Sequence, residues 1–259
     1  MGVQYYTWSG ETLAMADSYR ALCSDFYVNL KLNLKLDLPR ERQTVLDLFD
    51  RVRRQFPAMN QFRRYRDEVA LETEQGQSPN RWAAIRNNNI RAGSVNPETL
   101  AEAYNLHQHV LEVAPFFLSI SPLDVDFIEL LYGFDLQASG NHDEIVYQAL
   151  VSGSPLAKLL DIPEARLTDC QPLYGLSVQD GETDVEVNFE VKTRSASRGG
   201  REDEPISVYL TLRRFGPVSD VHQLPQVLSQ LARLGEELAD SRVVPRLVVP
   251  IREAIGSNR

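Results

Sequence analysis

A polar stretch between residues 81 and 91 has the residue types that an anion-binding site needs. Arg81 and Trp82 begin it, and Arg86 and Arg91 flank three successive asparagines. An arginine fork can bind an anion, and an indole ring can stack on a planar ligand. The plainer interpretation is a strand whose side chains alternate between core and solvent, with a bulge or a sheet edge at the asparagines, which are poor strand formers.

Two lysines extend this candidate site, because they lie on the polar side of a second predicted strand. We therefore predict that a small anionic ligand would bind to side chains from both strands. The predicted ligand-binding residues are Lys31, Lys35, Trp82, Arg86 and Arg91. The acidic residues of a predicted strand at 184–193 would complete the polar surface around them.

Two histidine-containing motifs could support other chemistry. His107 and His109 form an H-x-H pair, but in a helix such side chains point about 200° apart, and zinc sites need three or four converging ligands. His142 with Asp143 or Glu144 could form a general acid–base pair. Against that, Asn141 is a good N-cap and acidic residues favour the first turn of a helix. We therefore predict no metal and no cofactor.

The catalytic motifs that the sequence can be searched for are absent. It contains no Walker pattern, no G-x-G-x-x-G and no G-x-S-x-G. Cys23 and Cys170 have no histidine near them in sequence, and we expect two free, buried thiols in a reducing cytoplasm. We assign no catalytic residue and favour a protein that is not an enzyme.

The charge distribution argues against nucleic acid as the main partner. The formal net charge is −9, and all of it lies in residues 121–259, which carry 13 basic and 22 acidic side chains. A phosphate backbone binds through cationic contacts. The one basic region is residues 40–66, with eight arginines, and it keeps nucleic-acid binding as a weaker hypothesis. No run of about 18 apolar residues is present, so no membrane span is predicted.

The first half of the chain reads as strand, helix, two strands, helix. Leucines alternate with Asn, Lys and Asp along 27–38, which predicts a strand with one dry face and one wet face. Helical spacing of apolar residues predicts a helix over 39–56. Strands are predicted at 62–73 and 82–91, followed by a helix over 97–113 capped by Asn96.

The second half reads in a similar order. A strand is predicted at 126–136, an interrupted helix at 142–160, strands at 167–178, 184–193 and 206–214, and a helix at 219–238. The resulting fold class is α+β, an antiparallel sheet with helices on one face in a duplicated ferredoxin-like β-α-β-β-α arrangement. The predicted divisions are an arm (1–25), two halves (26–120 and 121–240) and a tail (241–259).

Both chain ends carry apolar residues that could cover the domain or contact another chain. Tyr5, Tyr6 and Trp8 lie in the arm, which has no basic and apolar pattern of a secretory signal. The tail has an apolar run broken by Pro245 and Pro250, which predicts that it is a poor long helix. Apolar surface of this kind often serves association.

The second half resembles a known family at one strand. Phe127–Leu136, the helix after it and the strands that follow Cys170-Gln171 resemble a sporadically distributed bacterial family of uncharacterised proteins of about this length. Many members carry a G-L-R-Y-x-N pattern at this strand. Here Tyr132 matches, whereas Leu131 and Phe134 stand in place of the Arg and the Asn. The resemblance spans residues 26–215 in element order and implies a bacterial or archaeal origin and a duplicated α+β fold, with no reaction assigned.

The leading functional hypothesis is a non-catalytic, self-associating interaction or assembly protein of the cytoplasm. Its basis is the absence of a catalytic constellation together with apolar segments at both ends. The alternative is a binding protein or enzyme for an anionic small molecule on the polar sheet face. The third hypothesis is nucleic-acid binding through residues 40–66.

Overall fold

The computed structural model describes residues 18–39, 41–181, 183–193 and 204–257. Within them, nine strands form one antiparallel sheet in the order β2-β3-β4-β5-β1-β6-β9-β8-β7. The aromatic residues Tyr5, Tyr6 and Trp8 lie outside the described residues. The α+β class with helices on an antiparallel sheet is therefore confirmed.

The two long central strands pair with each other. β1 (Asp25–Leu34) and β6 (Val125–Leu136) run antiparallel, and Leu30 stands opposite Leu130. The predicted alternation of β1 is confirmed, because Val28, Leu30 and Leu32 are at most 1% exposed. The strand ends earlier than predicted, and Leu36 beyond it is 68% exposed.

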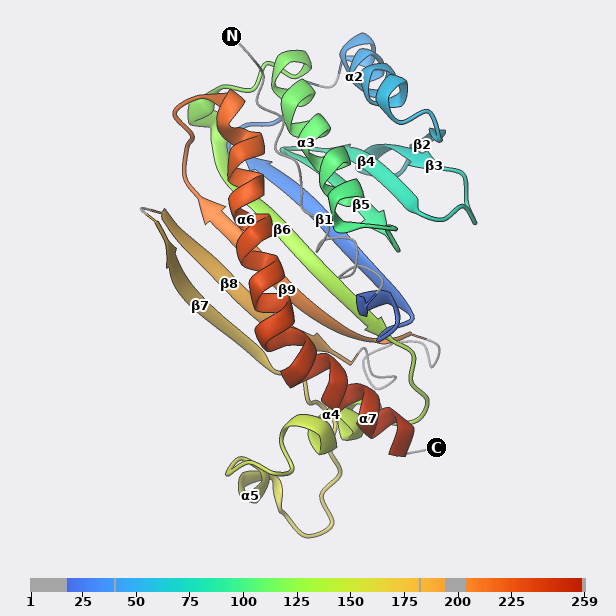
Figure 1. The fold of residues 1–259 in the computed structure, drawn as a ribbon, viewed down its shortest axis with the longest axis vertical. Helices are drawn as coiled ribbons and strands as arrows, with labels where there is room; N and C mark the ends of the chain where they lie inside the picture. The colour runs from blue at the N-terminus through green and yellow to red at the C-terminus, as the bar shows by residue number, and fades with distance from the viewer. Residues whose placement is uncertain (1–17, 40, 182, 194–203, 258–259) are drawn as a thin grey trace.

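Meanders extend the sheet on both sides of this pair. On one side they consist of β2 (Met59–Arg64), β3 (Glu68–Thr73), β4 (Asn80–Arg86) and β5 (Asn89–Val95). On the other side they consist of β7 (Leu173–Asp180), β8 (Thr183–Lys192) and β9 (Ile206–Phe215). β5 and β9, the last strand of each meander, return to pair with β1 and β6. β2 and β7 are thus the two edges of the sheet (Figure 1).

The helices cover one face of the sheet. α3 (Leu100–Phe117) packs on β5 and β1, α6 (Leu224–Leu238) packs on β6 and β9, and α2 (Arg42–Gln55) packs on α3. α4 (His142–Leu150) and the short α5 (Ala157–Leu160) belong to the connection from β6 to β7. Two 3₁₀ turns, η1 (Pro122–Asp124) and η3 (Val221–Gln223), precede β6 and α6. Figure 1 shows α6 crossing the sheet diagonally, with β7 at the far edge of the sheet.

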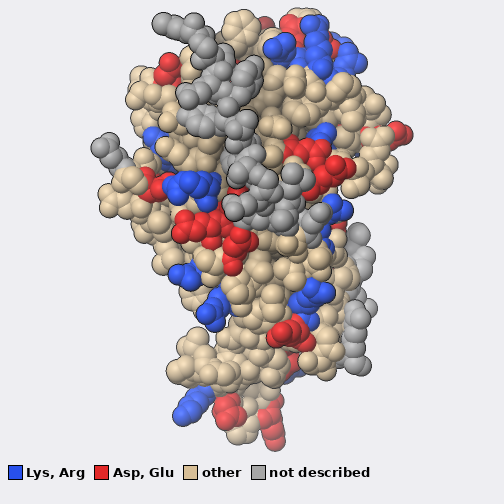
Figure 2. Space-filling model, viewed as in Figure 1, with Lys and Arg blue, Asp and Glu red and all other residues tan. Residues whose placement is uncertain are grey.

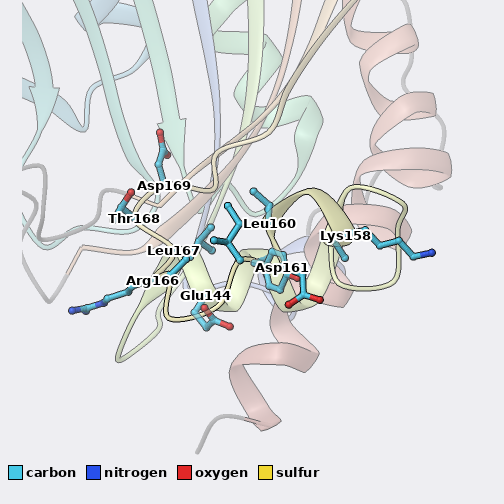
Figure 3. A pocket seen from close by; sticks show the side chains of 12 residues that line it. Glu144, Lys158, Leu160, Asp161, Arg166, Leu167, Thr168 and Asp169 are labelled. Atoms are coloured by element: carbon cyan, nitrogen blue, oxygen red, sulfur yellow. The ribbon is translucent and has the colours of Figure 1, made fainter.

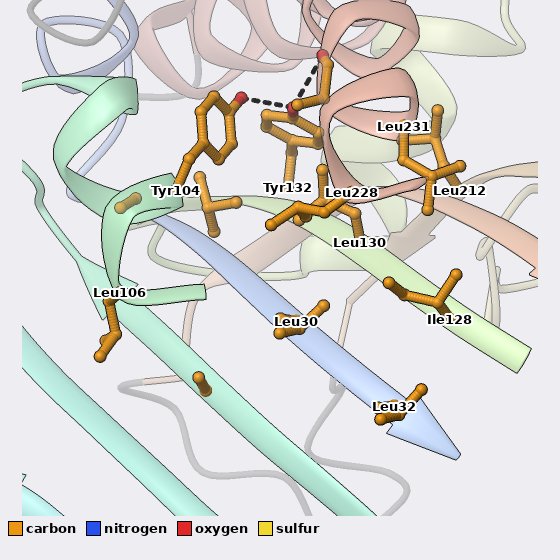
Figure 4. Packing of buried hydrophobic residues seen from close by; sticks show 14 of the residues in the cluster. Leu30, Leu32, Tyr104, Leu106, Ile128, Leu130, Tyr132, Leu212, Leu228 and Leu231 are labelled. Carbon is orange, nitrogen blue, oxygen red and sulfur yellow. Dashed lines mark hydrogen bonds between the residues drawn. The ribbon is translucent and has the colours of Figure 1, made fainter. Parts of the chain in front are cut away.

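A buried tyrosine pair connects the two long helices to the sheet. The hydroxyl oxygens of Tyr104 on α3 and Tyr132 on β6 lie 2.6 Å apart, and Tyr132 also donates to the Ala232 carbonyl of α6 (Figure 4). A Cβ at Gly235 would lie 2.4 Å from the Tyr132 ring, so only glycine permits this close approach. Burial raises the pKa of both phenols, which stay protonated as hydrogen-bond donors.

The halves contain more strands than the predicted β-α-β-β-α order. The strand predicted at 62–73 is in fact a hairpin, made of parts of β2 and β3 with a turn at 65–67. The strand predicted at 82–91 is also a hairpin, made of parts of β4 and β5 with a turn at Asn87-Asn88. The asparagines therefore mark a two-residue hairpin turn, a position that suits their short polar side chains. The first half is β-α-β-β-β-β-α, and the ferredoxin-like order does not describe it.

Two helix predictions also differ from the structure. Thr99, and not Asn96, caps α3 by accepting a hydrogen bond from the Glu102 amide, while Asn96 has a positive φ of 51°. The tail forms a helix that continues from α6 through the π-helix η4 (Ala239–Val248) to α7 (Val249–Ser257). The wider π-helical turns accommodate Pro245 within the helix. α7 packs on α4, so the tail covers its own domain.

We expect Leu30→Ala to lower the free energy of unfolding by about 2–5 kcal/mol, because it opens a cavity beneath the central strands. Leu36→Ala is the matched control from the same leucine series, and its change should stay within about 0.5 kcal/mol because the side chain is exposed. Urea unfolding followed by circular dichroism measures both values. Equal effects for the two variants would contradict the assignment of faces.

Candidate functional site

The sheet face opposite the helices carries four of the five predicted ligand residues, and three of these lie close together. In register, Lys31 of β1 stands directly opposite Arg91 of β5 on one side and Glu129 of β6 on the other. Trp82 stands opposite Gly93 of β5, and the Arg91 guanidinium carbon lies 5.7 Å from the centre of the Trp82 ring. We call this surface the polar face, and Lys31, Trp82 and Arg91 lie together near its centre.

The other two predicted residues lie away from this group. Arg86 ends β4, is half-exposed and lies 4.0 Å from an Asp67 oxygen. Lys35 follows the end of β1, and its Nζ donates to the Leu123 carbonyl at 3.0 Å. The sequence placed it with Lys31 because the predicted strand was too long.

Cross-strand ion pairs neutralise most of the charge on the polar face. The Arg91 guanidinium pairs with Glu68 of β3. Arg213 of β9 lies 2.9 Å from Glu129 and 3.0 Å from Glu186 of β8. The acidic strand β8 is separated from β1 by β6 and β9, so it faces Arg213 and not Lys31. Sequence reasoning missed Arg213, although the alternation of Thr211, Arg213 and Phe215 along β9 was a usable signal.

Lys31 is the exception on this face. Its Nζ lies 5.0 Å from the centre of the Phe127 ring, and among the described residues no carboxylate oxygen is within 4.0 Å of it. Buried polar atoms without a hydrogen-bond partner surround it: Asn29 Oδ1, Asn89 Oδ1 and Arg91 Nε. Buried polar groups in native proteins are almost always partnered, so this cluster has unused capacity for a ligand or for water.

Tyr27 and Tyr209 form an aromatic area at one end of the polar face. Their ring centres lie 6.4 Å apart, and the Tyr27 ring lies where a Cβ on Gly133 would be. The Tyr27 hydroxyl donates to Asp135 at 3.2 Å. Desolvation by burial raises the pKa of Tyr27, with further contributions from Tyr209 and Asp135, so its phenol is not poised to act as a base.

His142 and Asp143 are structural and anchor the connection between β6 and β7. Both are buried, and Asp143 Oδ1 accepts from the Thr193 hydroxyl at 2.6 Å and from the Cys170 amide at 2.9 Å. The His142 ring nitrogens lie 2.9 Å from the Thr193 carbonyl and 3.2 Å from the Ala138 carbonyl. Asn141 caps α4 by accepting from two backbone amides, as predicted.

The connection from β6 to β7 that these contacts anchor is long and includes α5, and we call it the excursion. It carries a pocket of about 610 Å³. Figure 3 shows Leu160 and Leu167 near the middle of its lining, while Lys158 and Arg166 extend away from it. Glu144, Asp161 and Asp169 also line it.

Exposed apolar side chains gather along this excursion and the edge strand after it. Large apolar residues with at least 42% exposure run from α5 into β7: Leu156, Leu159, Leu160, Ile162, Leu173, Tyr174 and Leu176. On β7 the alternation places Tyr174 and Leu176 on the helix side of the sheet, where no described helix covers them. We call these seven residues the β7 surface.

The remaining candidates from the sequence do not form sites. Cys23 and Cys170 are free, as predicted, and half-buried; burial raises the pKa of Cys23 to about 12 and also raises that of Cys170. His107 is buried near Val28, whereas the His109 ring meets the ring of Phe56, the residue that follows α2, edge to face. Among the described residues no group of three or more His, Cys, Asp or Glu side chains could hold a metal ion. No described helix could span a membrane.

Comparison with known proteins adds no assignment. No protein-family model matches the chain, and no curated protein matches it.

His107 provides a test of the packing beneath α3. Burial lowers its pKa from 6.5 to about 3, so the unfolded chain binds a proton at this residue below pH 6.5 while the folded chain does not. Stability from this group is therefore lost as the pH falls from 6.5 towards 3. We expect His107→Gln to remove this dependence, so the difference in unfolding free energy between wild type and variant should shrink by about 1.5 kcal/mol from pH 6.5 to 5.

Urea unfolding at each pH measures this difference. His107→Asn is a second variant at the same position, and it should remove the same pH dependence because it also lacks an imidazole. Parallel pH curves for wild type and His107→Gln would contradict a buried, neutral His107.

Proposed function

We propose that this chain is a non-catalytic assembly protein that associates with a second copy of itself through the β7 surface. The observation that carries the proposal is an edge strand that no described element covers, with large apolar side chains on it. Leu173, Tyr174 and Leu176 are 60%, 58% and 53% exposed. The outward backbone N–H and C=O groups of an edge strand are free to pair with another strand.

A comparison of the two edges supports this choice. β2 carries Arg63 and Arg64 and has a register irregularity between Met59 and Gln61, which are devices that prevent edge pairing. β7 has no charged residue from Leu173 to Gln179, no proline and no register irregularity against β8. Only the β7 edge therefore lacks protection against pairing.

The absence of charge favours a second copy over a charged partner. In a two-fold interface the same patch lies on both sides, so residues near the axis meet their own copies. Charged residues there would repel one another, and β7 has none before Asp180. Asp180 itself pairs with Arg233 at 2.5 Å. An antiparallel β7–β7 pair would continue the sheet into the second copy.

We make two further proposals, on the origin of the two halves and on the location of the protein. We propose that the halves derive from a duplicated unit, because each begins with a central strand and ends with a strand that returns beside it, followed by a long helix. We also propose a cytoplasmic location, which the two free thiols support.

A second candidate function is the binding of a small anion at the polar face. The specific observation is Lys31, whose ammonium group has only a ring contact among the described residues, next to the unpartnered atoms of Asn29, Asn89 and Arg91. Nucleic acid is the weaker hypothesis, because Asp50 pairs with Arg53 and Arg54 and Glu72 pairs with Arg63 within the basic region. Figure 2 shows Lys and Arg side chains gathered in the region of α2, with Asp and Glu among them.

We expect the wild-type protein to form a dimer at tens of micromolar, as measured by sedimentation equilibrium. Leu176→Lys should weaken the dimer at least tenfold, because it places like charges across the two-fold axis. Asn60→Lys, an exposed position on the opposite edge strand, is the matched control and should change nothing. A strictly monomeric wild type, or a dimer insensitive to Leu176→Lys, would contradict the proposal.

For the second candidate, a thermal-shift screen with inorganic phosphate, citrate and ATP is the test. We expect at least one of them to raise the melting temperature of the wild type and to lose most of that effect in Lys31→Met, because the ammonium group supplies the unpaired charge. Lys35→Met is the control, since its Nζ is already bound to the Leu123 carbonyl. Equal responses in wild type and Lys31→Met would remove the polar face as an anion site.

A further inference from the structure

A small cavity lies between the first turn of α2 and the β2–β3 hairpin, at the opposite edge of the sheet from β7. Its volume is about 320 Å³, at the lower end of the range of roughly 300–1,000 Å³ typical of small-molecule sites. Its apolar lining consists of Val45, Leu46, Phe62, Val69 and Ile85. We call it the α2 pocket.

Three arginines line the same pocket: Arg42, Arg64 and Arg66. Among the described residues, none of the three guanidinium groups has a hydrogen bond or a carboxylate within 4.0 Å. The other arginines nearby differ, because Arg53 and Arg54 pair with Asp50, and Arg63 pairs with Glu72. Arg51 of α2 likewise has no carboxylate within 4.0 Å among the described residues, but it does not line the pocket. Three unpaired guanidinium groups are thus gathered at the pocket.

The two acidic residues of the lining do not neutralise these arginines. Glu68 pairs with Arg91 on the polar face, and the closest cation to Asp67 is Arg86, at 4.0 Å. Each carboxylate is therefore directed to an arginine outside the pocket. The pocket keeps a local excess of positive charge in a protein whose net charge is −9.

One wall of the α2 pocket is aromatic. Phe62 is 49% exposed, and its other side packs on Phe49 of α2, with ring centres 5.8 Å apart. The two rings meet edge to face, and the exposed part of Phe62 can contact an aromatic group in the pocket. Tyr65 also lines the pocket, and its hydroxyl is held by Glu72 at 2.8 Å.

We propose that the α2 pocket binds a phosphate monoester attached to an aromatic ring. Guanidinium groups bind phosphate oxygens in a bidentate manner, and three of them match a dianionic phosphate. The ring would enter the apolar part against Phe62 and Val69. The site is independent of the β7 surface and of Lys31, and it goes beyond the proposed assembly role.

Isothermal titration with 1-naphthyl phosphate tests the proposal. We expect binding at least tenfold tighter than that of 1-naphthol or inorganic phosphate, because each of these has only one of the two recognised features. Arg64→Gln and Arg42→Gln should each weaken 1-naphthyl phosphate at least tenfold. Arg53→Gln is the matched control on the same helix and should leave affinity unchanged, since Arg53 is paired with Asp50 outside the pocket.

Three outcomes would overturn the proposal. They are no binding of 1-naphthyl phosphate at millimolar concentration, equal binding of 1-naphthol, and equal losses for Arg53→Gln and Arg64→Gln. The last of these would indicate a diffuse basic surface, such as one that binds a single-stranded oligonucleotide. Arg42 and Arg64 are exposed, so circular dichroism and the melting temperature should show that both variants keep the wild-type fold.

Discussion

The antiparallel pairing of β1 with β6 is the constraint on which the rest of the structure depends. The register places Leu30 opposite Leu130 and Leu32 opposite Ile128, and all four side chains are at most 1% exposed. A shift by one residue would turn every one of these side chains to the other face. Because β5 and β9 take their register from β1 and β6, the central pair decides which residues of the whole sheet are covered by helices.

The same register produces the polar face, and cross-strand ion pairs make that face compatible with water. Arg213 holds Glu129 and Glu186 together, so one side chain connects β9 to the strands on both sides of it. Partly exposed pairs of this kind contribute only about 0–1 kcal/mol each. Their effect is on specificity, since a wrong register would put like charges opposite each other. With this face largely neutralised, Lys31 stands out on it as a cation with no carboxylate within 4.0 Å among the described residues.

Sequence patterns over a few residues predicted the features that depend on neighbouring residues alone. The alternation along β1 and β8 predicted two strands and their faces, and Asn141 was correctly identified as a cap. The hairpins in the first half were missed because Ala83, Ala84 and Ile90 continue an apolar pattern through the turn at Asn87-Asn88. The helical tail was missed because the π-helical turns around Pro245 depend on packing against the domain and not on local propensity.

Some parts of the candidate sites could be predicted from the sequence, and others depend on the three-dimensional fold. Lys31 and Arg91 could be predicted as neighbours on a polar face, because alternation assigns them to it. The role of β7 could not, since a strand is an edge only through the order of the whole sheet. Likewise, eight arginines between residues 40 and 66 were visible in the sequence. Which of them stay unpaired depends on Asp50 and Glu72, and on the hairpin that aligns Glu72 with Arg63.

Interface size decides how much of the β7 surface an assembly must use. A stable protein interface buries about 800 Å² on each partner, and association costs at least about 4 kcal/mol in lost freedom of motion. An eight-residue strand such as β7 is too short to bury that much alone. The four apolar side chains of the excursion, Leu156, Leu159, Leu160 and Ile162, would have to contribute as well. The hydrogen bonds of Asp143 to Thr193 and Cys170 would then favour association, because they fix the base of the excursion. A fixed segment loses less conformational entropy when it binds a second copy.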